Sequence, residues 1–423
     1  IIFESQEYSV IKISENAFPI KNNKIVAINF PENSNVKTIE SYSIHAYTLS
    51  KINIPQSIEN LGECWCKNTR FLKNIPISLK NKHFKYKDEE KHLIFCKSDQ
   101  NSDCFDSILF GDRNIIKLIL PDYIKHIKPC AFENCYHLTK FIISEPSQLQ
   151  SIGSHSLGET NIKSLYFPSS LKNLDKYWCN DTFSLCDIII SPNNKYFKHS
   201  DENDRIILGK SNPNSDCFDE IVFASRSIFS VQIPNYIKRI RPCAFEHCQW
   251  LSKVEFQKDS QLEIIDDYSF RHTSIIEIKI PDSVCQIGKG AFSTCRKLIT
   301  FELTKKSKLQ ALSYGLFEGC DYLMNVKLFD TSFLKKIESY SLLALGLRSI
   351  YITSNIEEIG DSWGGYHLEN VTISQKNKWF KFLRNSHIIV GKSNPSSDCY
   401  DEIVFGCKNI TNAFIPKYIK KIR

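Results

Sequence analysis

The sequence lacks the features that mark membrane spans and the common cofactor sites. No window of 18 consecutive apolar residues occurs, which excludes a transmembrane helix within this segment. The glycine-rich loops G-x-x-x-x-G-K-S/T and G-x-G-x-x-G are absent, which removes the usual sequence support for a nucleotide cofactor. Cysteine pairs with the C-x2-C spacing of zinc sites are missing as well. We therefore expect no cofactor, no metal site and no membrane span in this segment.

A large excess of one charge is also missing. The 423 residues include 54 Lys and Arg against 47 Asp and Glu, a formal net charge of +7. This balance falls short of the clustered basicity of a dedicated nucleic-acid-binding protein, so we expect no nucleic-acid partner. The segment begins at Ile1 without Met or a signal peptide, and it ends at Arg423 inside a repeat. We expect it to be a fragment of a longer chain, and its missing targeting segments say nothing about compartment.

What the sequence has instead is a repeat of about 23 residues. Three clear copies span residues 118–138, 231–251 and 276–298. They share a short apolar strand, a Pro, a polar gap, an Ile, then Ala-Phe-x-x-Cys and Leu. Self-similarity at this period, with strand-forming runs, is typical of a leucine-rich-repeat solenoid. One repeat cannot bury its apolar face alone, so stacking of neighbouring repeats forms the core.

A second, longer motif interrupts the regular repeats three times. Its copies contain Cys104, Cys217 and Cys399, which are 113 and 182 residues apart. The difference of 69 residues equals three 23-residue repeats, which indicates duplication of a block. In each copy two apolar runs flank a Ser- and Asn-rich turn, as in a hairpin. We predict elongated, hairpin-like repeats near residues 78–115, 191–228 and 374–410.

These motifs resemble those of the BspA-like leucine-rich-repeat family over essentially all 423 residues. The regular motif reads Ile278-x-Ile280-Pro281, then Ile287-Gly288, then Ala291-Phe292-x-x-Cys295. The elongated motif reads Asn194-x-x-Phe197 followed by Asp204-x-Ile206-Ile207. The resemblance implies large proteins, often on the surface of bacteria and parasitic protists, that bind host or neighbouring-cell proteins.

The expected fold is a single leucine-rich-repeat solenoid through residues 1–423. We expect one long parallel β-sheet on its concave side. Short turns and 3-10 or helical segments should form the convex side, with three elongated hairpin-like repeats.

The 16 cysteines are expected to be mostly reduced and buried. Four of them stand three residues after the repeat Phe, a position fixed by the repeat: Cys135, Cys248, Cys295 and Cys320. A small, weakly polar thiol packs well inside such a turn. Some disulfides, or a metal site, are the alternatives. A catalytic cysteine would be a singular residue rather than a repeated one, so we expect no catalytic residues.

The Ser-Asp-Cys-Phe/Tyr-Asp segment of each elongated repeat has a structural and a cation-binding interpretation. Asp216 and Asp219 are three residues apart, and a carboxylate pair can hold Ca²⁺. The alternating oxygen ligands of a calcium loop are missing. We favour the structural interpretation, in which Asp216 caps the turn and Cys217-Phe218 packs into the core.

The candidate binding face follows from strand alternation. In each strand the residue two before the Pro position should point away from the core. The candidate partner-binding residues are Ile119, Ile142, Tyr166, Ile189, Gln232, Glu255, Lys279, Glu302, Lys327 and Tyr351. The first four form an apolar stretch, and contiguous exposed apolar residues tend to mark interaction sites. Cover by a neighbouring loop, or plain β-propensity, would explain them equally well, and the charged neighbours could simply pair across the sheet.

The sequence thus favours a non-enzymatic protein-recognition solenoid, used for adhesion or interaction at a cell surface. Its ligand would be a protein or glycoprotein on the concave face. The alternative is an intracellular leucine-rich-repeat scaffold that uses the same surface. An enzyme with a site on an elongated repeat is the remote alternative.

Overall fold

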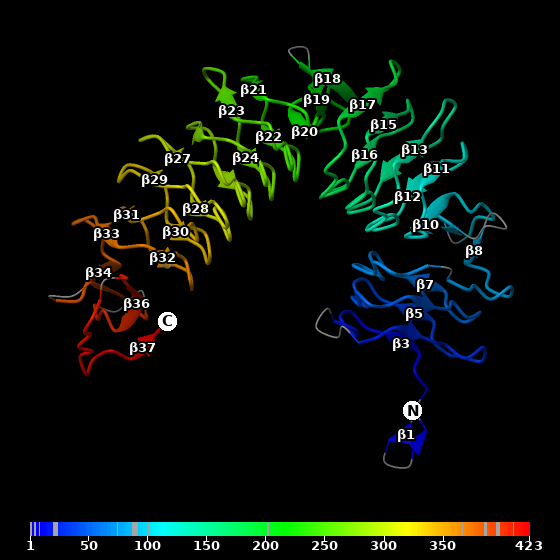
Figure 1. Ribbon diagram of the computed structural model, residues 1–423, viewed down its shortest axis with the longest axis horizontal. Helices are drawn as coiled ribbons and strands as arrows, with labels where there is room; N and C mark the ends of the chain where they lie inside the picture. The colour runs from blue at the N-terminus through cyan, green and yellow to red at the C-terminus, as the bar shows by residue number, and fades with distance from the viewer. Residues whose placement is uncertain are drawn as a thin grey trace. The chain divides into compact units, whose positions relative to one another are not determined.

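The computed structural model describes all residues except 1, 4, 5, 8, 20–23, 74, 87–91, 100, 201, 202, 366, 385, 386, 395–397 and 409. The chain divides into two compact units, residues 1–198 (unit 1) and 199–423 (unit 2), and each is described by itself (Figure 1). Stacked parallel strands in both units confirm the predicted solenoid. The prediction that one solenoid runs through all 423 residues stays a prediction.

Each coil contributes two strands, and only the first of these was predicted. The first series carries the apolar run before the Pro. In unit 1 it comprises β4 (Ala27–Ile28), β6 (Lys51–Ile52), β11 (Lys117–Ile119), β13 (Lys140–Ile142), β15 (Ser164–Phe167) and β17 (Asp187–Ile190). In unit 2 it comprises β21 (Ser230–Ile233), β23 (Lys253–Phe256), β25 (Glu277–Lys279), β27 (Thr300–Glu302), β29 (Asn325–Lys327), β31 (Ser349–Ile352) and β33 (Asn370–Ile373).

The second series consists of two-residue strands just before the turn that carries the repeat Phe. In unit 1 these are β3 (Lys12–Ile13), β5 (Thr38–Ile39), β7 (Asn60–Leu61), β12 (His126–Ile127), β14 (Ser151–Ile152) and β16 (Asn173–Leu174). In unit 2 they are β22 (Arg239–Ile240), β24 (Ile264–Ile265), β26 (Gln286–Ile287), β28 (Ala311–Leu312), β30 (Lys336–Ile337), β32 (Glu358–Ile359) and β37 (Lys421–Ile422). A short antiparallel pair, β1 (Ile2–Phe3) and β2 (Gln6–Glu7), precedes them in unit 1.

The strands do not form the single long sheet that we expected. In unit 2 the first series gives one five-stranded sheet, β21-β23-β25-β27-β29, and a separate pair, β31-β33. The second series is divided as well, with β28-β30-β32 as a sheet of its own. Figure 1 shows β23, β27 and β29 along one side of unit 2 and β24, β28 and β30 along the other. Strands of two to four residues make few ladder bonds per coil, so small shifts between coils interrupt the pairing.

The elongated repeats are three-stranded antiparallel meanders, so the predicted hairpins are confirmed and a third strand precedes each. They comprise β8 (Phe84–Tyr86), β9 (Leu93–Cys96) and β10 (Ser107–Gly111); β18 (Phe197–Ser200), β19 (Asn203–Gly209) and β20 (Glu220–Ala224); and β34 (Phe380–Phe382), β35 (Ile388–Gly391) and β36 (Glu402–Gly406). The last strand of each meander continues in parallel with the second series, as β10 does with β12 and β36 with β37.

Turns take the place of the expected 3-10 or helical segments. The residues that the structure describes include no helix, and therefore none that could cross a membrane. Around Phe132, the left-handed residues Cys130 (φ 58°) and Asn134 (φ 64°) interrupt any right-handed helix. The backbone of the turn bonds to the next coil instead, since the Phe132 N–H donates to the Ser156 carbonyl at 2.8 Å. The Ala-Phe-x-x-Cys motif therefore encodes a stacking turn.

The repeat positions fill the core as predicted. The buried repeat residues include Ile52, Ile54, Phe132, Phe245, Ile278, Ile280 and Phe292. In unit 2 the Phe270 ring stacks between Phe245 and Phe292, with ring centroids 4.9 and 5.4 Å apart. Stacked aromatic rings add an attraction beyond the burial of their area. Phe at the same place in successive coils therefore builds a continuous aromatic stack.

Candidate functional site

The predicted apolar stretch is an exposed row on unit 1. Ile119 and Ile189 each keep 60% of their surface and Ile142 keeps 39%, while Tyr166 is half-buried. We call these four residues the apolar row. The register pairs Ile119 with Ile142 and Tyr166 with Ile189. Side chains that alternate with the row, such as Leu118, point into the core.

No described segment covers the apolar row, because its isoleucines are exposed. The Glu145 carboxylate contacts the row, because it accepts a hydrogen bond from the Tyr166 hydroxyl at 3.4 Å. The Ser169 N–H donates to the same carboxylate and helps to hold its pKa below the ordinary value. A second exposed row flanks the first on the same face and includes Lys117, Lys140, Ser164 and Asp187. The face is therefore apolar along one line and partly cationic beside it.

The corresponding face of unit 2 carries its predicted residues, and its charges pair with one another. Glu302 accepts from Lys327 at 2.9 Å and lies 3.1 Å from the Lys279 ammonium. These two lysines hold the pKa of the Glu302 carboxyl below its ordinary value. Glu255 pairs with Lys253 of its own strand at 2.8 Å, not with Lys279 as the sequence suggested. The charged row is defined as Gln232, Glu255, Lys279, Glu302, Lys327 and Tyr351.

The remaining predicted residues of the charged row have distinct surroundings. The Tyr351 hydroxyl donates to Asp330 at 2.9 Å and is half-buried. Gln232 stands opposite Glu255 in the register and is exposed. An open groove of about 720 Å³ runs beside Gln232, Glu255 and Lys279. The structure thus brings three predicted residues of unit 2 to one concavity, which strand alternation alone did not predict.

The acidic segments of the elongated repeats differ from the prediction. Asp219, not Asp216, accepts hydrogen bonds from the Ser211 N–H at 2.9 Å and the Ser211 hydroxyl at 2.8 Å. Asp216 and Cys217 are exposed, so the predicted cap and the predicted burial of Cys217 are both wrong. The bond from Ser211 to Asp219 closes the base of the turn and leaves the residues of its tip outside the core. Phe218 is half-buried beneath the Lys210 ammonium.

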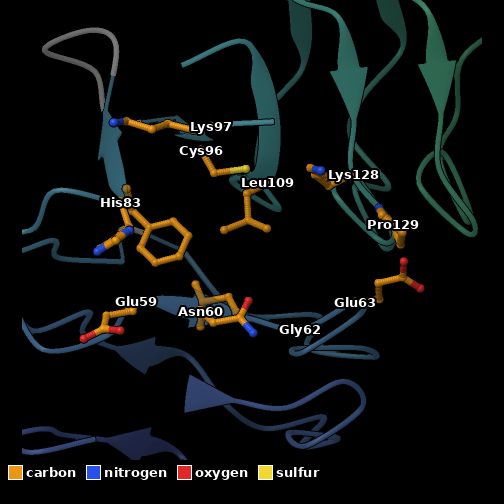
Figure 2. A pocket seen from close by; sticks show the side chains of 12 residues that line it. Glu59, Asn60, Gly62, Glu63, His83, Cys96, Lys97, Leu109, Lys128 and Pro129 are labelled. Carbon is orange, nitrogen blue, oxygen red and sulfur yellow. The ribbon is translucent and has the colours of Figure 1, made fainter. Parts of the chain in front are cut away.

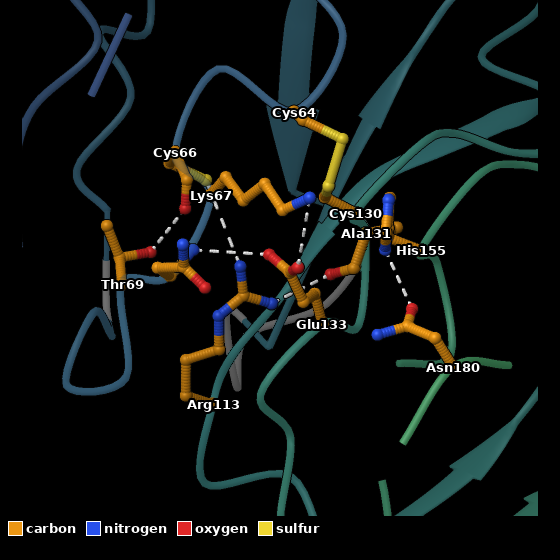
Figure 3. Close-up of a disulfide and its surroundings, with 11 residues drawn as sticks. Cys64, Cys66, Lys67, Thr69, Arg113, Cys130, Ala131, Glu133, His155 and Asn180 are labelled. Carbon is orange, nitrogen blue, oxygen red and sulfur yellow. Dashed lines mark hydrogen bonds and ion pairs between the residues drawn. A yellow bond between two sulfur atoms is a disulfide. The ribbon is translucent and has the colours of Figure 1, made fainter. Parts of the chain in front are cut away.

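The four repeat cysteines are buried and form no disulfide, as predicted: Cys135, Cys248, Cys295 and Cys320. A disulfide that the sequence did not specify joins Cys64 to Cys130 in unit 1, across 66 residues (Figure 3). Both of its cysteines have left-handed backbones, with φ of 50° and 58°. The bond therefore ties the coil before the first elongated repeat to the coil after it.

A buried charged cluster lies beside this disulfide (Figure 3). The Arg113 guanidinium donates to the Ala131 carbonyl at 3.0 Å and contacts the thiol of Cys66 at 3.9 Å. Glu133 is 2% exposed, accepts from a backbone N–H at 3.2 Å and lies 4.0 Å from the Lys67 ammonium. Burial raises the pKa of the Cys66 thiol to about 11, which keeps it protonated and unreactive. The cluster thus joins residues from both sides of the first elongated repeat.

The sequence of the chain matches a known family of repeat proteins. The model of the BspA type leucine rich repeat region matches with 6 copies, over residues 2–92, 102–201, 217–331, 257–365 and 303–392. The chain belongs to the BspA-type leucine-rich-repeat family. A search of curated proteins finds no match to the sequence.

Several solved structures similar to this BspA-type chain are of bacterial proteins. A leucine-rich repeat protein from Eubacterium ventriosum is 15% identical, with 88% of this chain and 92% of that chain covered and a TM-score of 0.47. A leucine rich cell surface protein from Faecalibacterium prausnitzii is 16% identical, with the same coverage and TM-score. The pneumococcal vaccine antigen PcpA is 16% identical, covers 82% of this chain and 89% of its own, and has a TM-score of 0.43.

One short motif in this BspA-type chain formally matches that of serine hydrolases. Residues 360–364 read Gly-Asp-Ser-Trp-Gly, which fits G-x-S-x-G. In hydrolases this motif forms a sharp turn between a strand and a helix. Here Ser362 follows the two-residue strand β32 in a repeat turn, and Trp363 fills the repeat Phe position inside the core. The motif is a product of the repeat, without the strand–turn–helix context.

Proposed function

We propose that this BspA-type chain is a non-enzymatic recognition protein that binds a protein ligand, or a glycosylated protein, through the apolar row of unit 1. The observation that carries the proposal is the exposure of three isoleucines on β11, β13 and β17. Tyr166 on β15 stands between the second and the third. Burying an aliphatic side chain contributes roughly 1.5–3 kcal/mol, so a partner that covers this row gains several such contributions. Folding alone gives no comparable gain, because the row stays in water.

The chemistry of the row indicates the kind of surface that would fit it. Tyr166 lies between Ile142 and Ile189 and has a polar tip, which suits it as a central anchor. Lys117 and Lys140 flank the isoleucines on the same face, so acidic residues beside an apolar ridge would complement them. Such a ridge in an extended or helical segment of a protein is the ligand we favour. Glycans on that protein would lie outside the apolar contact.

The cell surface is the proposed location, as the family resemblance implies. An intracellular scaffold that uses the same apolar row is the alternative, and the geometry suits either. Labelling intact cells with a membrane-impermeant reagent, followed by detection of this chain, separates the two. Labelling at the level of a known surface protein supports the surface location, and labelling only after lysis supports the scaffold.

The binding proposal is tested with substitutions in the two units. Surface proteins captured by the full chain are identified by mass spectrometry, and the affinity of the purified partner is measured by biolayer interferometry. Tyr166→Ala and Ile142→Asp should each weaken this affinity by about 30-fold or more, as expected for central anchors. Lys279→Ala in the charged row is the matched control and should change it less than about 3-fold. Unchanged binding by folded Tyr166→Ala and Ile142→Asp variants contradicts the proposal.

A further inference from the structure

A small cavity in unit 1 lies beside the free edge of β7, at the first elongated repeat (Figure 2). Its volume is about 180 Å³, the share of roughly six liquid waters at ~30 Å³ each. Leu61, Phe84, Cys96 and Leu109 line it and are buried, and Glu63 and Lys128 are among its other lining residues. In Figure 2 the side chains of Lys128 and Glu63 lie on the same side of the cavity. The site thus combines an apolar surface with charged groups, since Glu59 and Lys97 line it as well.

A backbone acceptor faces this cavity without a partner. In the parallel pairing of β5 with β7, Ile39 stands opposite Leu61, and the Gly62 N–H donates to the Ile39 carbonyl at 2.8 Å. The backbone groups of Leu61 therefore point away from β5. Within the described part of the chain, no donor reaches the Leu61 carbonyl. A buried carbonyl without a donor is costly, so a ligand that supplies one gains affinity.

The equivalent place in unit 2 is filled by the protein itself. There the Arg423 guanidinium donates to the carbonyl of Ile359, the residue that corresponds to Leu61, and to the Glu402 carboxylate at 2.8 Å. When the first elongated repeat is aligned with the third by Cys104 and Cys399, Lys128 corresponds to Arg423 and Ser107 corresponds to Glu402. A shorter cation and the loss of the carboxylate leave this space open in unit 1. The cavity is therefore a specific departure from the repeat.

The charges at the cavity divide into paired and unpaired groups. Glu59 lies 3.2 Å from Lys37, and the Lys97 ammonium lies 3.9 Å from Asp103. Glu63 and Lys128 belong to no ion pair among the residues that the structure describes, and they are not paired with each other. A ligand with an anion and a cation a short distance apart would satisfy both.

We propose that this cavity binds a small aliphatic α-amino acid as its zwitterion. The ligand carboxylate accepts from the Lys128 ammonium. Its ammonium group donates to the Leu61 carbonyl and approaches the Glu63 carboxylate. The aliphatic side chain fills the space among Leu61, Phe84 and Leu109. Binding is non-covalent and does not involve the apolar row. The test of this proposal is therefore independent of the test of the proposed function.

The buried thiol in the cavity wall takes no part in the chemistry. Burial raises the pKa of Cys96 to about 11, so its nucleophilic thiolate form is scarce near neutral pH. The aliphatic and aromatic part of the wall comes from Leu61, Phe84 and Leu109, and an apolar group that displaces poorly ordered water from such a surface gains affinity. The side chain of the ligand therefore contributes by burial, and its charged end gives orientation.

Isothermal titration calorimetry of the full chain with L-leucine tests the proposal. Two probes each lack one charge, 4-methylpentanoate without the ammonium group and isoamylamine without the carboxylate. L-leucine should bind, and each of these probes should bind at least about 10-fold more weakly, because each loses one charge-assisted hydrogen bond. No saturable binding of L-leucine up to millimolar concentration overturns the proposal, and so does equal binding of all three.

Variants distinguish this cavity from any other site on the chain. Lys128→Met keeps the length of the side chain and should weaken L-leucine binding about 10-fold or more. Lys97→Met is the matched control, since Lys97 also lines the cavity but is engaged by Asp103, and it should change binding less than about 3-fold. Ser107→Glu with Lys128→Arg recreates the pair of unit 2 and should abolish binding. Wild-type affinity in Lys128→Met, or an equal loss in both lysine variants, overturns the proposal even if the double variant fails to fold.

Discussion

Units 1 and 2 share one repeat but present opposite surfaces at the same strand positions. The apolar row of unit 1 exposes Ile119, Ile142 and Ile189 to water. In unit 2 the same positions hold Lys279, Glu302 and Lys327, which are joined by two ion pairs. A face whose charges pair internally offers little to a partner, because binding must first desolvate those charges. The repeat thus fixes which residues point outward, and residue type decides whether they are available for binding.

The interiors of the two units differ as well. Unit 2 stacks Phe245, Phe270 and Phe292 in consecutive coils. Unit 1 has fewer repeat phenylalanines and adds the disulfide between Cys64 and Cys130. The phenylalanine stack of unit 2 is held by contacts between consecutive coils. The disulfide of unit 1 instead joins two coils that an elongated repeat separates. Four predictions test whether this contrast holds.

The largest effect is expected for the aromatic stack. Phe270→Ala should lower the free energy of unfolding by about 3–5 kcal/mol, because it empties a fully buried ring site between two stacked rings. Leu157→Ala, at the equivalent position of unit 1, removes fewer atoms and no stacking contact, so it should cost less. Urea denaturation followed by circular dichroism measures both. A larger loss for the Leu157 variant would break the contrast between the interiors.

Replacing the disulfide should weaken unit 1 by a comparable amount. Cys64→Ser with Cys130→Ser removes a cross-link between residues 66 positions apart. The loop-closure model assigns such a link about 4 kcal/mol of the free energy of unfolding. Dithiothreitol should lower the urea midpoint of the wild type and leave that of the double variant unchanged. Cys243, which corresponds to Cys130 but forms no disulfide, provides the control Cys243→Ser. Equal sensitivity of the double variant to dithiothreitol contradicts a stabilising role of this bond.

Acid should weaken unit 1 through a histidine in its turn. Burial lowers the pKa of His155 to about 4, from an ordinary value of 6.5, and the ring Nδ1–H donates to the Asn180 side-chain oxygen at 2.7 Å. The folded state favours the neutral form of His155. The contribution of this histidine to the free energy of unfolding is therefore complete above pH 6.5 and is lost as the pH falls toward 4. The loss amounts to at most about 3 kcal/mol.

His155→Asn is the variant for this test, because Asn tolerates the left-handed φ of 55° at this position. Urea unfolding between pH 4 and pH 7.5 should show a shallower pH dependence in the variant than in the wild type. Identical slopes would show that another group causes the acid sensitivity.

The smallest effect is expected in the charged row. Glu302→Gln removes the carboxylate shared by Lys279 and Lys327, and should cost less than about 1 kcal/mol because the pairs are exposed and screened. The difference between variant and wild type should shrink further in 1 M NaCl. A loss of several kcal/mol that persists in high salt would mean that this row is a structural network.

The sequence by itself determined the solenoid, its register and the outward positions. Periodicity suffices for this, since a residue such as Phe292 or Ile278 recurs at a fixed place in every coil and has one face available for burial. It also predicted the apolar row, because strand alternation is a local property of the backbone. The second strand series escaped notice, since two residues are too few to show a period.

Only the tertiary structure decided which distant residues meet. The link from Cys64 to Cys130 depends on how the coils are placed, not on spacing. The exposure of Cys217 likewise depends on how its turn is placed. The cavity beside Leu61 arises for the same reason. The cavity is open or filled according to whether the side chain of Lys128 or Arg423 reaches the carbonyl of Leu61 or Ile359. That distance is set by packing between coils, not by the sequence of a single repeat.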